Sequence, residues 1–145
     1  MWSAEYDPET GSISSAPAGA DLNGDGVKDV IAATRSGRLV ARDGRDGKLL
    51  WPRVDLGAPT RMPPAVGDWN GDGTPDLVVT TAKRTTLFIS GKDGTAVRAP
   101  YEAEPDIYSI TGLMDGLTYG APALADMNGD GRLDAVLTPT GGRLV

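Results

Sequence analysis

Short apolar runs separated by glycine and polar residues recur along the chain and predict β-strands rather than helices. The runs at 30–32, 77–79 and 135–137 each follow a polar loop directly. Apolar runs of this length between turn residues are typical of short strands. The 20 glycines and 11 prolines among 145 residues also disfavour long helices. The pattern therefore predicts an all-β fold.

The polar loop before each run is a repeat. The pattern D-x-N-G-D-G-x-x-D begins at Asp21, at Asp68 and at Asp126, and a Pro-Ala-containing lead-in precedes each copy. The first two copies are 47 residues apart and the next two are 58 apart, which places an insertion of about eleven residues in 101–119. A period of this length is that of a propeller blade or a similar four-stranded unit. We therefore expect a β-propeller-like array of four-stranded antiparallel blades, with fewer than three blades in this chain.

The strands of each expected blade follow from the same alignment. The lead-in forms the first strand, and Asp-Gly turns at 46–47 and 93–94 precede the fourth. The expected second strands are 29–34, 76–81 and 134–138, the third strands 38–42, 85–90 and 143–145, and the fourth strands 48–51 and 95–98. One domain then divides into an N-terminal strand with linker (1–14), a first blade (15–61), a second blade with insertion (62–119) and a partial third blade (120–145).

Composition removes several function classes. The chain has no cysteine and no histidine, so ordinary zinc sites and the usual Ser-His-Asp or Cys-His nucleophile systems cannot be built. The net charge of −6 argues against nucleic acid and anionic membranes as partners. No stretch approaches the roughly 20 apolar residues of a membrane span, and residues 1–6 lack the features of a signal peptide. We expect a protein that is not an enzyme.

The three loops have the composition of calcium sites. Ca²⁺ takes about six to eight oxygen ligands, which side chains at loop positions 1, 3, 5 and 9 and the main-chain carbonyl at position 7 can supply. Position 12 is not glutamate and the flanks are strands, so the loops are not EF-hands. The alternative is that Asp, Asn and Gly only form turns. The expected ligands are Asp21, Asn23, Asp25, Val27 and Asp29 in the first site, Asp68, Asn70, Asp72, Thr74 and Asp76 in the second, and Asp126, Asn128, Asp130, Arg132 and Asp134 in the third.

Charge supports occupancy of these sites. Three aspartates in each loop account for nine of the 20 acidic residues, and such crowded carboxylates repel one another unless neutralised. Three Ca²⁺ ions would balance the net charge of −6. Mg²⁺ suits the loops less, because it requires strict octahedral geometry and keeps its waters.

The repeated loop and its flanking strands resemble the FG-GAP/VCBS-type calcium-binding repeats of integrin α-subunit propellers and many secreted bacterial proteins. The resemblance covers almost the whole chain and implies a propeller blade with a Ca²⁺ loop between its first two strands. Weak all-oxygen loops suit the millimolar calcium found outside cells, so we expect an extracellular or cell-surface location. Residues 42–51 show a weaker similarity to the hairpin of quinoprotein-type blades. Propellers of the family have more blades than this chain supplies.

The ends of the chain suggest self-association. Residues 1–6 read as a spare fourth strand, whereas the third unit stops at Val145 before its own fourth strand. Open strand edges favour pairing, so head-to-tail strand exchange could produce a homo-oligomer, either a six-bladed ring or a filament. The alternative is that the chain is a fragment of a longer propeller.

The leading hypothesis for function is a structural or adhesive calcium-binding module outside the cell. One alternative is a lectin-like propeller that binds a glycan through exposed aromatics such as Trp69 or Tyr108. Another is a non-catalytic part of a larger secreted protein. The 101–119 insertion is expected to be a surface excursion, with a binding loop as the alternative.

Overall fold

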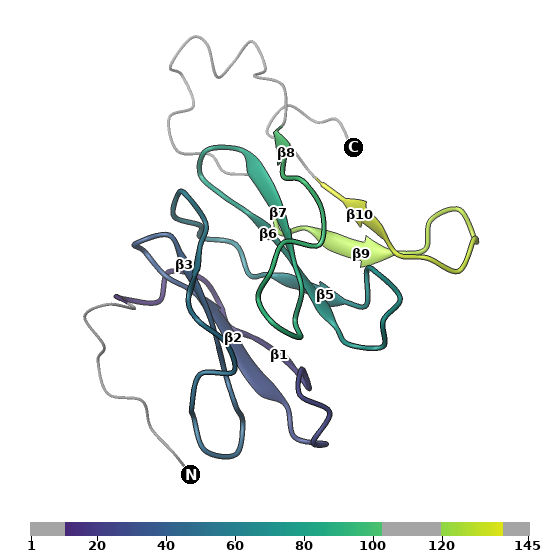
Figure 1. The fold of residues 1–145 in the computed structure, drawn as a ribbon. Helices are drawn as coiled ribbons and strands as arrows, with labels where there is room; N and C mark the ends of the chain where they lie inside the picture. The colour runs from purple at the N-terminus through teal and green to yellow at the C-terminus, as the bar shows by residue number, and fades with distance from the viewer. Residues whose placement is uncertain (1–10, 103–119, 138–145) are drawn as a thin grey trace, which may run out of the picture.

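Residues 11–102 and 120–137 of the computed structural model are described, and they form three antiparallel sheets without a helix (Figure 1). Two sheets have four strands, in the orders β1-β2-β3-β4 and β5-β6-β7-β8, and the third pairs β9 with β10. The strands are β1 (Ala18–Ala20), β2 (Asp29–Ala33), β3 (Arg38–Arg42), β4 (Val54–Asp55), β5 (Ala65–Gly67), β6 (Asp76–Thr80), β7 (Thr85–Ile89), β8 (Tyr101–Glu102), β9 (Ala123–Ala125) and β10 (Asp134–Val136). The sheets are referred to below as blades 1, 2 and 3.

The first two strands of every blade have the same register. The residue before each Asp-rich loop pairs with the ninth residue of that loop, as Ala20 with Asp29, Gly67 with Asp76 and Ala125 with Asp134. Each loop is therefore the closed end of a hairpin. The first strands of successive blades also lie next to one another, with β5 in contact with both β1 and β9. Adjacent inner strands and outward-running sheets make this a propeller-like array (Figure 1).

The prediction for the fourth strand was wrong in position. In blade 1 the chain pairs at Leu49 with Arg42, leaves the ladder, and forms β4 only where Val54 pairs with Leu39. The chain thus advances from 49 to 54 while β3 runs back from 42 to 39, which makes a bulge. Pro52 lies in this bulge, where its missing N–H breaks no ladder hydrogen bond. In blade 2 the same bulge separates the bridge at Ala96 from β8.

The core lies between the blades as well as within them. Ile31, Leu39, Leu77, Val79 and Ile89 are buried in one cluster that spans blades 1 and 2. Trp51, in the bulge of blade 1, is only 4% exposed and belongs to the same cluster. Its indole Nε1 donates to the carbonyl oxygen of Gly91 in blade 2 at 3.0 Å. The bulge therefore directs a large side chain across the seam between the two blades.

Several predictions fall outside the described residues. The expected strand at 1–6, almost all of the 101–119 insertion with Tyr108, and the expected strand at 143–145 all lie there. They stay predictions, as does the division of the chain into blade segments. Nothing in the described ranges is a helix long and apolar enough to cross a membrane.

Candidate metal-binding loops

Position 1 of each loop holds the turn together. The Asp21 carboxylate accepts the backbone N–H groups of Gly24 at 2.7 Å, Asp25 at 3.1 Å and Gly26 at 2.8 Å. Asp68 and Asp126 accept the corresponding three N–H groups at 2.7–3.1 Å. The glycines at positions 4 and 6 have φ between 75° and 86° in all three loops. Only glycine adopts this conformation readily, which explains why both positions repeat without change.

Positions 3 and 5 continue the same pattern. In loop 2, Asn70 Oδ1 accepts the N–H of Asp72 at 2.8 Å, and Asp72 Oδ1 accepts the N–H of Thr74 at 2.8 Å. The equivalent bonds are present in loops 1 and 3 at 2.7–3.0 Å. Side chains at positions 1, 3 and 5 therefore all bond to their own loop, each accepting N–H groups from residues ahead of it.

Position 9 bonds back to the start of every loop, and in loops 1 and 2 it also reaches another part of the blade. Asp29 is 1% exposed, and its two carboxylate oxygens accept the N–H groups of Leu22 at 2.8 Å and Gly44 at 3.0 Å. Asp76 is equally buried and accepts the N–H groups of Trp69, Asn70 and Gly91. In loop 3, Asp134 accepts the N–H of Met127 at 2.9 Å. In blades 1 and 2 the position-9 carboxylate thus links the start of the loop to the hairpin that follows β3 or β7.

Sequence analysis did not identify the two glycines, Gly44 and Gly91, whose N–H groups donate to this carboxylate. A Cβ atom on Gly44 would overlap the carbonyl oxygen of Lys28, and one on Gly91 would overlap that of Pro75. Each glycine stands 15 residues after its aspartate. That equal spacing in both units was the signal in the sequence that could have revealed them.

The electrostatics of the loops follow from these contacts. Backbone N–H groups hold the pKa of the Asp21 and Asp126 carboxyls below the usual value. The largest contribution comes from the N–H of Gly26 for Asp21 and from that of Gly131 for Asp126. The N–H of Thr74 lowers the pKa of Asp72 in the same way. Burial raises the pKa of Asp76 despite the N–H groups that it accepts. The exposed part of each loop therefore favours ionised carboxylates.

The donor set fits a hard cation, although the structure does not gather the carboxylates around one point. In the described residues no three acidic side chains of a loop converge as a metal cluster. A carboxylate has about four lone-pair positions. Asp21 uses three of them for N–H groups, and Asp29 uses two. Free acceptor positions therefore remain, and carboxylate and amide oxygens are the ligands that Ca²⁺ accepts.

Loop 1 differs from the other two in its outer contacts. Asp25 Oδ2 pairs with Arg45 Nε at 2.7 Å, and Asn23 Nδ2 donates to Asp43 at 3.0 Å. In loops 2 and 3 the asparagine instead donates to the aspartate two positions later. The Arg45 side chain is thus already paired with one of the candidate ligands of loop 1.

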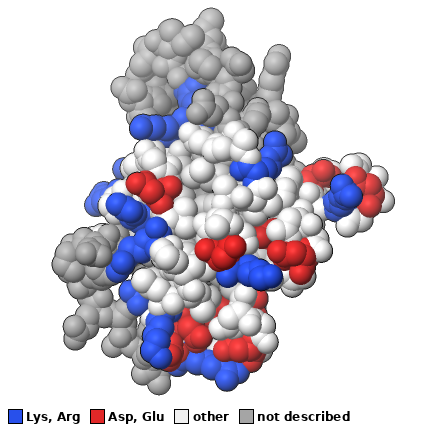
Figure 2. Space-filling model, in the orientation of Figure 1, with Lys and Arg blue, Asp and Glu red and all other residues white. Residues whose placement is uncertain are grey.

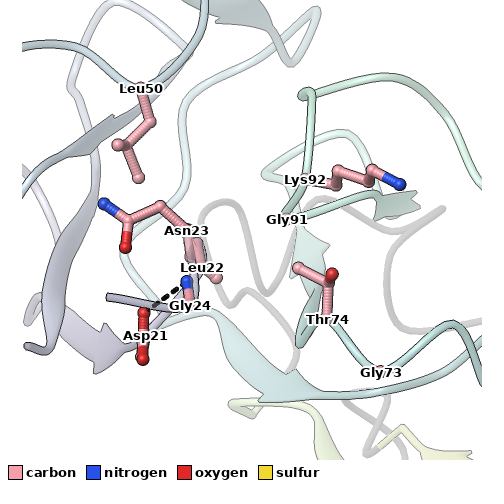
Figure 3. Close-up of a pocket in the computed structure, with 9 residues that line it drawn as sticks. All are labelled: Asp21, Leu22, Asn23, Gly24, Leu50, Gly73, Thr74, Gly91 and Lys92. Carbon is pink, nitrogen blue, oxygen red and sulfur yellow. Dashed lines mark hydrogen bonds between the residues drawn. The ribbon is translucent and has the colours of Figure 1, made fainter. Parts of the chain in front are cut away.

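A hollow of about 370 Å³ opens between blades 1 and 2, at the end of the sheets where loops 1 and 2 lie. Figure 3 shows Asp21 and Asn23 of loop 1 on one side of it, with Thr74 and Lys92 of blade 2 on the other. Leu22 lies beside Asn23 and Gly24 and is 5% exposed. The hollow brings a candidate ligand of one blade opposite a cation of the next.

Comparison with known proteins identifies the repeat. The sequence profile of the FG-GAP-like repeat matches residues 21–79 and 68–137, well over half of the chain. The chain belongs to the FG-GAP-like repeat family. Each match to the FG-GAP-like repeat begins at the first aspartate of one loop and runs past the end of the next loop. No curated protein matches the chain.

Two solved structures share the fold of this FG-GAP-like chain. The biofilm matrix protein Bap1 of V. cholerae is 26% identical, with a TM-score of 0.66 over 97% of this chain. BamB of Moraxella catarrhalis is 25% identical, with a TM-score of 0.52 over 68% of this chain. The chain spans only about a quarter (26%) of either protein. The likeness thus covers one part of each of two larger molecules.

Of the two aromatic residues considered for glycan binding, Trp69 is described and packs within its own blade. Its ring lies 5.0 Å from that of Phe88, and the Arg98 guanidinium covers Phe88 at 4.9 Å. Trp69 is half-buried. This packing favours a structural role for Trp69 over an open stacking surface.

Proposed function

We propose that the chain is a calcium-binding, non-catalytic repeat module of an extracellular structural or adhesive protein. The observation that carries the proposal is the same hydrogen-bond network in three loops, each leaving oxygen acceptors free. The ligands would be the side chains at positions 1, 3, 5 and 9 with the carbonyl at position 7. A bound ion would supply positive charge among nine carboxylates that otherwise repel one another.

The place of the loops in the fold suggests a stabilising role for calcium. Each loop joins the first two strands of a blade, and in blades 1 and 2 the position-9 aspartate reaches the next hairpin. An ion that ligates positions 1 to 9 would therefore hold three strands of one blade in place. Binding to the folded state alone raises stability by mass action.

The setting of the module follows from its relatives and from calcium chemistry. Bap1, with the same fold over nearly the whole chain, is a biofilm matrix protein. Calcium sites of extracellular modules commonly have dissociation constants of about 10⁻⁴–10⁻³ M. The absence of histidine and cysteine from the sequence also removes the usual nucleophile systems. These points support an adhesive or structural role over catalysis.

Calorimetric titration of the chelator-treated protein with CaCl₂ tests the proposal. We expect three ions per chain, and a melting temperature that rises with calcium and falls with EDTA. Asp126→Ala should reduce the uptake to two ions, because it removes the position-1 ligand of an exposed loop. Asp93→Ala is the matched control, since this aspartate lies in the β7 hairpin outside all three loops. No calcium uptake, together with an unchanged melting curve in EDTA, would contradict the proposal.

Self-association by strand exchange is a separate proposal. Sedimentation velocity with and without EDTA tests it, and we expect a dimer or larger species in calcium. A monomer of unchanged size in both conditions would remove strand exchange and leave the calcium proposal standing.

A further inference from the structure

A second hollow lies at the other end of the seam between blades 1 and 2. β2 leaves loop 1 at Asp29 and ends at Ala33, beside the turn at 35–37. The second hollow adjoins this turn, so it lies at the opposite end of the sheet from the Asp-rich loops (Figure 1). It has a volume of about 320 Å³ and is lined by Ile13, Ser14, Arg35, Pro59, Thr60 and Arg61.

Two arginines from neighbouring blades face this hollow. Arg35 belongs to the β2–β3 turn of blade 1, and Arg61 to the segment that leads into blade 2. Both are exposed, and neither has an ion-pair partner among the described residues. Two guanidinium groups that line one small hollow favour an anion between them.

The surroundings of the hollow are also cationic. Arg38 at the start of β3, and Lys83 and Arg84 in the β6–β7 turn, lie at the same end of the sheets. Asp55 is the one acid at this end whose side chain the structure describes. Figure 2 shows Lys and Arg side chains towards the top and upper left, around one acidic patch, and further Lys and Arg side chains beside the Asp and Glu side chains at the bottom and right. A chain with a net charge of −6 thus has a basic end.

The backbone around the hollow is held by hydrogen bonds, one of which joins the lead-in segments of the two blades. Ser14 Oγ donates to the carbonyl oxygen of Thr60 at 2.5 Å, which joins the lead-in segments of the two blades. The N–H of Arg35 donates to Ser12 at 2.8 Å, and that of Ala82 donates to Pro59 at 2.8 Å. Thr60 itself is 1% exposed. The two arginines therefore project from fixed main-chain positions, as a built site requires.

We infer that this basic hollow binds a carboxylate-bearing sugar unit of an acidic polysaccharide. The planar guanidinium fork matches a carboxylate in two parallel hydrogen bonds. The volume lies at the lower end of the range for ligand sites, which suits one unit of a polymer. Ile13, 58% exposed, and the exposed Pro59 offer apolar contact for the C–H face of a sugar ring. The choice of a polysaccharide as the ligand rests on the proposed extracellular role. The two arginines themselves belong to none of the three Asp-rich loops.

Nucleic acid fits the same surface less well. Binding to single strands relies on bases stacking on aromatic side chains, and no aromatic residue lines the hollow. Nucleic acid also presents a dense row of phosphates, which a chain of net charge −6 repels outside this small region. One carboxylate per sugar unit places a lower charge density against the protein.

Calorimetric titration of the full chain in saturating calcium with oligogalacturonate tests the inference. We expect binding that weakens at least about tenfold in Arg35→Gln/Arg61→Gln, a loss that corresponds to about 1.4 kcal/mol. Arg35→Lys/Arg61→Lys should also weaken binding, because lysine retains the charge but not the fork. Lys28→Gln/Lys48→Gln removes the same charge at the opposite end and should bind like the wild type. Neutral dextran should not bind.

Several results would overturn the inference. They are equal weakening in the Lys28/Lys48 control, tighter binding to single-stranded DNA of the same charge, and binding that appears only after Glu5→Gln/Asp7→Gln/Glu9→Gln. The last would mean that acidic residues of the same chain occupy the hollow. Calcium titration and melting of each variant separate the two proposals. A chain that takes up calcium without binding oligogalacturonate refutes only the basic hollow, and the converse refutes only the calcium sites.

Discussion

Trp51 provides the most direct test of how the blades are joined. The indole is 4% exposed, and its N–H donates to the carbonyl oxygen of Gly91 across the seam. Trp51→Phe keeps an aromatic ring but leaves that buried carbonyl without its donor, which costs about 1–3 kcal/mol. The smaller ring also leaves a cavity, for which we add about 1 kcal/mol. We therefore expect the free energy of unfolding to fall by about 2–4 kcal/mol.

Thermal and urea unfolding in saturating calcium measure this loss. For a chain of this size, 1 kcal/mol shifts the melting temperature by roughly 3–5 °C, so Trp51→Phe should melt roughly 10 °C lower. Trp69→Phe is the matched control: the same chemical change, made at a half-buried ring packed on Phe88, should cost less than about 1 kcal/mol. If the two substitutions lowered the free energy of unfolding equally, the contact of Trp51 with blade 2 would not be the cause of the larger expected loss.

Other substitutions address single features of the loops. Gly91→Ala should destabilise the fold by more than about 3 kcal/mol, because its Cβ would overlap a backbone carbonyl oxygen of loop 2. Gly71→Ala has open space around it and should cost only about 1–2 kcal/mol for its positive φ. Chemical denaturation measures both losses, and similar losses would contradict this reasoning. Asp76→Asn should lower stability by about 2 kcal/mol even in EDTA, since the carboxylate accepts buried N–H groups without help from a metal; no loss in EDTA would contradict this. Site one should be the weakest calcium site because Arg45 already pairs with Asp25, and Arg45→Gln should tighten it in a calcium titration; an unchanged or weaker site would exclude that competition.

The local parts of the fold were predictable from sequence. Alternation of apolar runs with turn residues located the second and third strands of both complete blades to within one residue. The repeated aspartates, asparagines and glycines located the three hairpin loops, because such residues form turns through their own side chains. In each case the information lies within about ten consecutive residues. The calcium ligands themselves stay a prediction.

The fourth strand shows where local reasoning fails. Residues 48–51 begin the strand as expected, with Leu49 opposite Arg42, but the chain then leaves the ladder. The departure allows Trp51 to reach Gly91, a residue of another blade. Burial of a large ring between blades outweighs continued pairing of a short edge strand, and no local pattern encodes that preference.

Sequence alone thus determined the repeat, its loops and the order of its strands, since each depends on spacing along a short stretch of chain. Only the tertiary structure decided that Asp29 and Asp76 reach the glycines of later hairpins, that Trp51 fills the seam, and that Arg35 and Arg61 share one hollow. These contacts join residues 15 to 40 positions apart. They depend on how one blade packs against its neighbour, and that packing is set by side chains of both blades together.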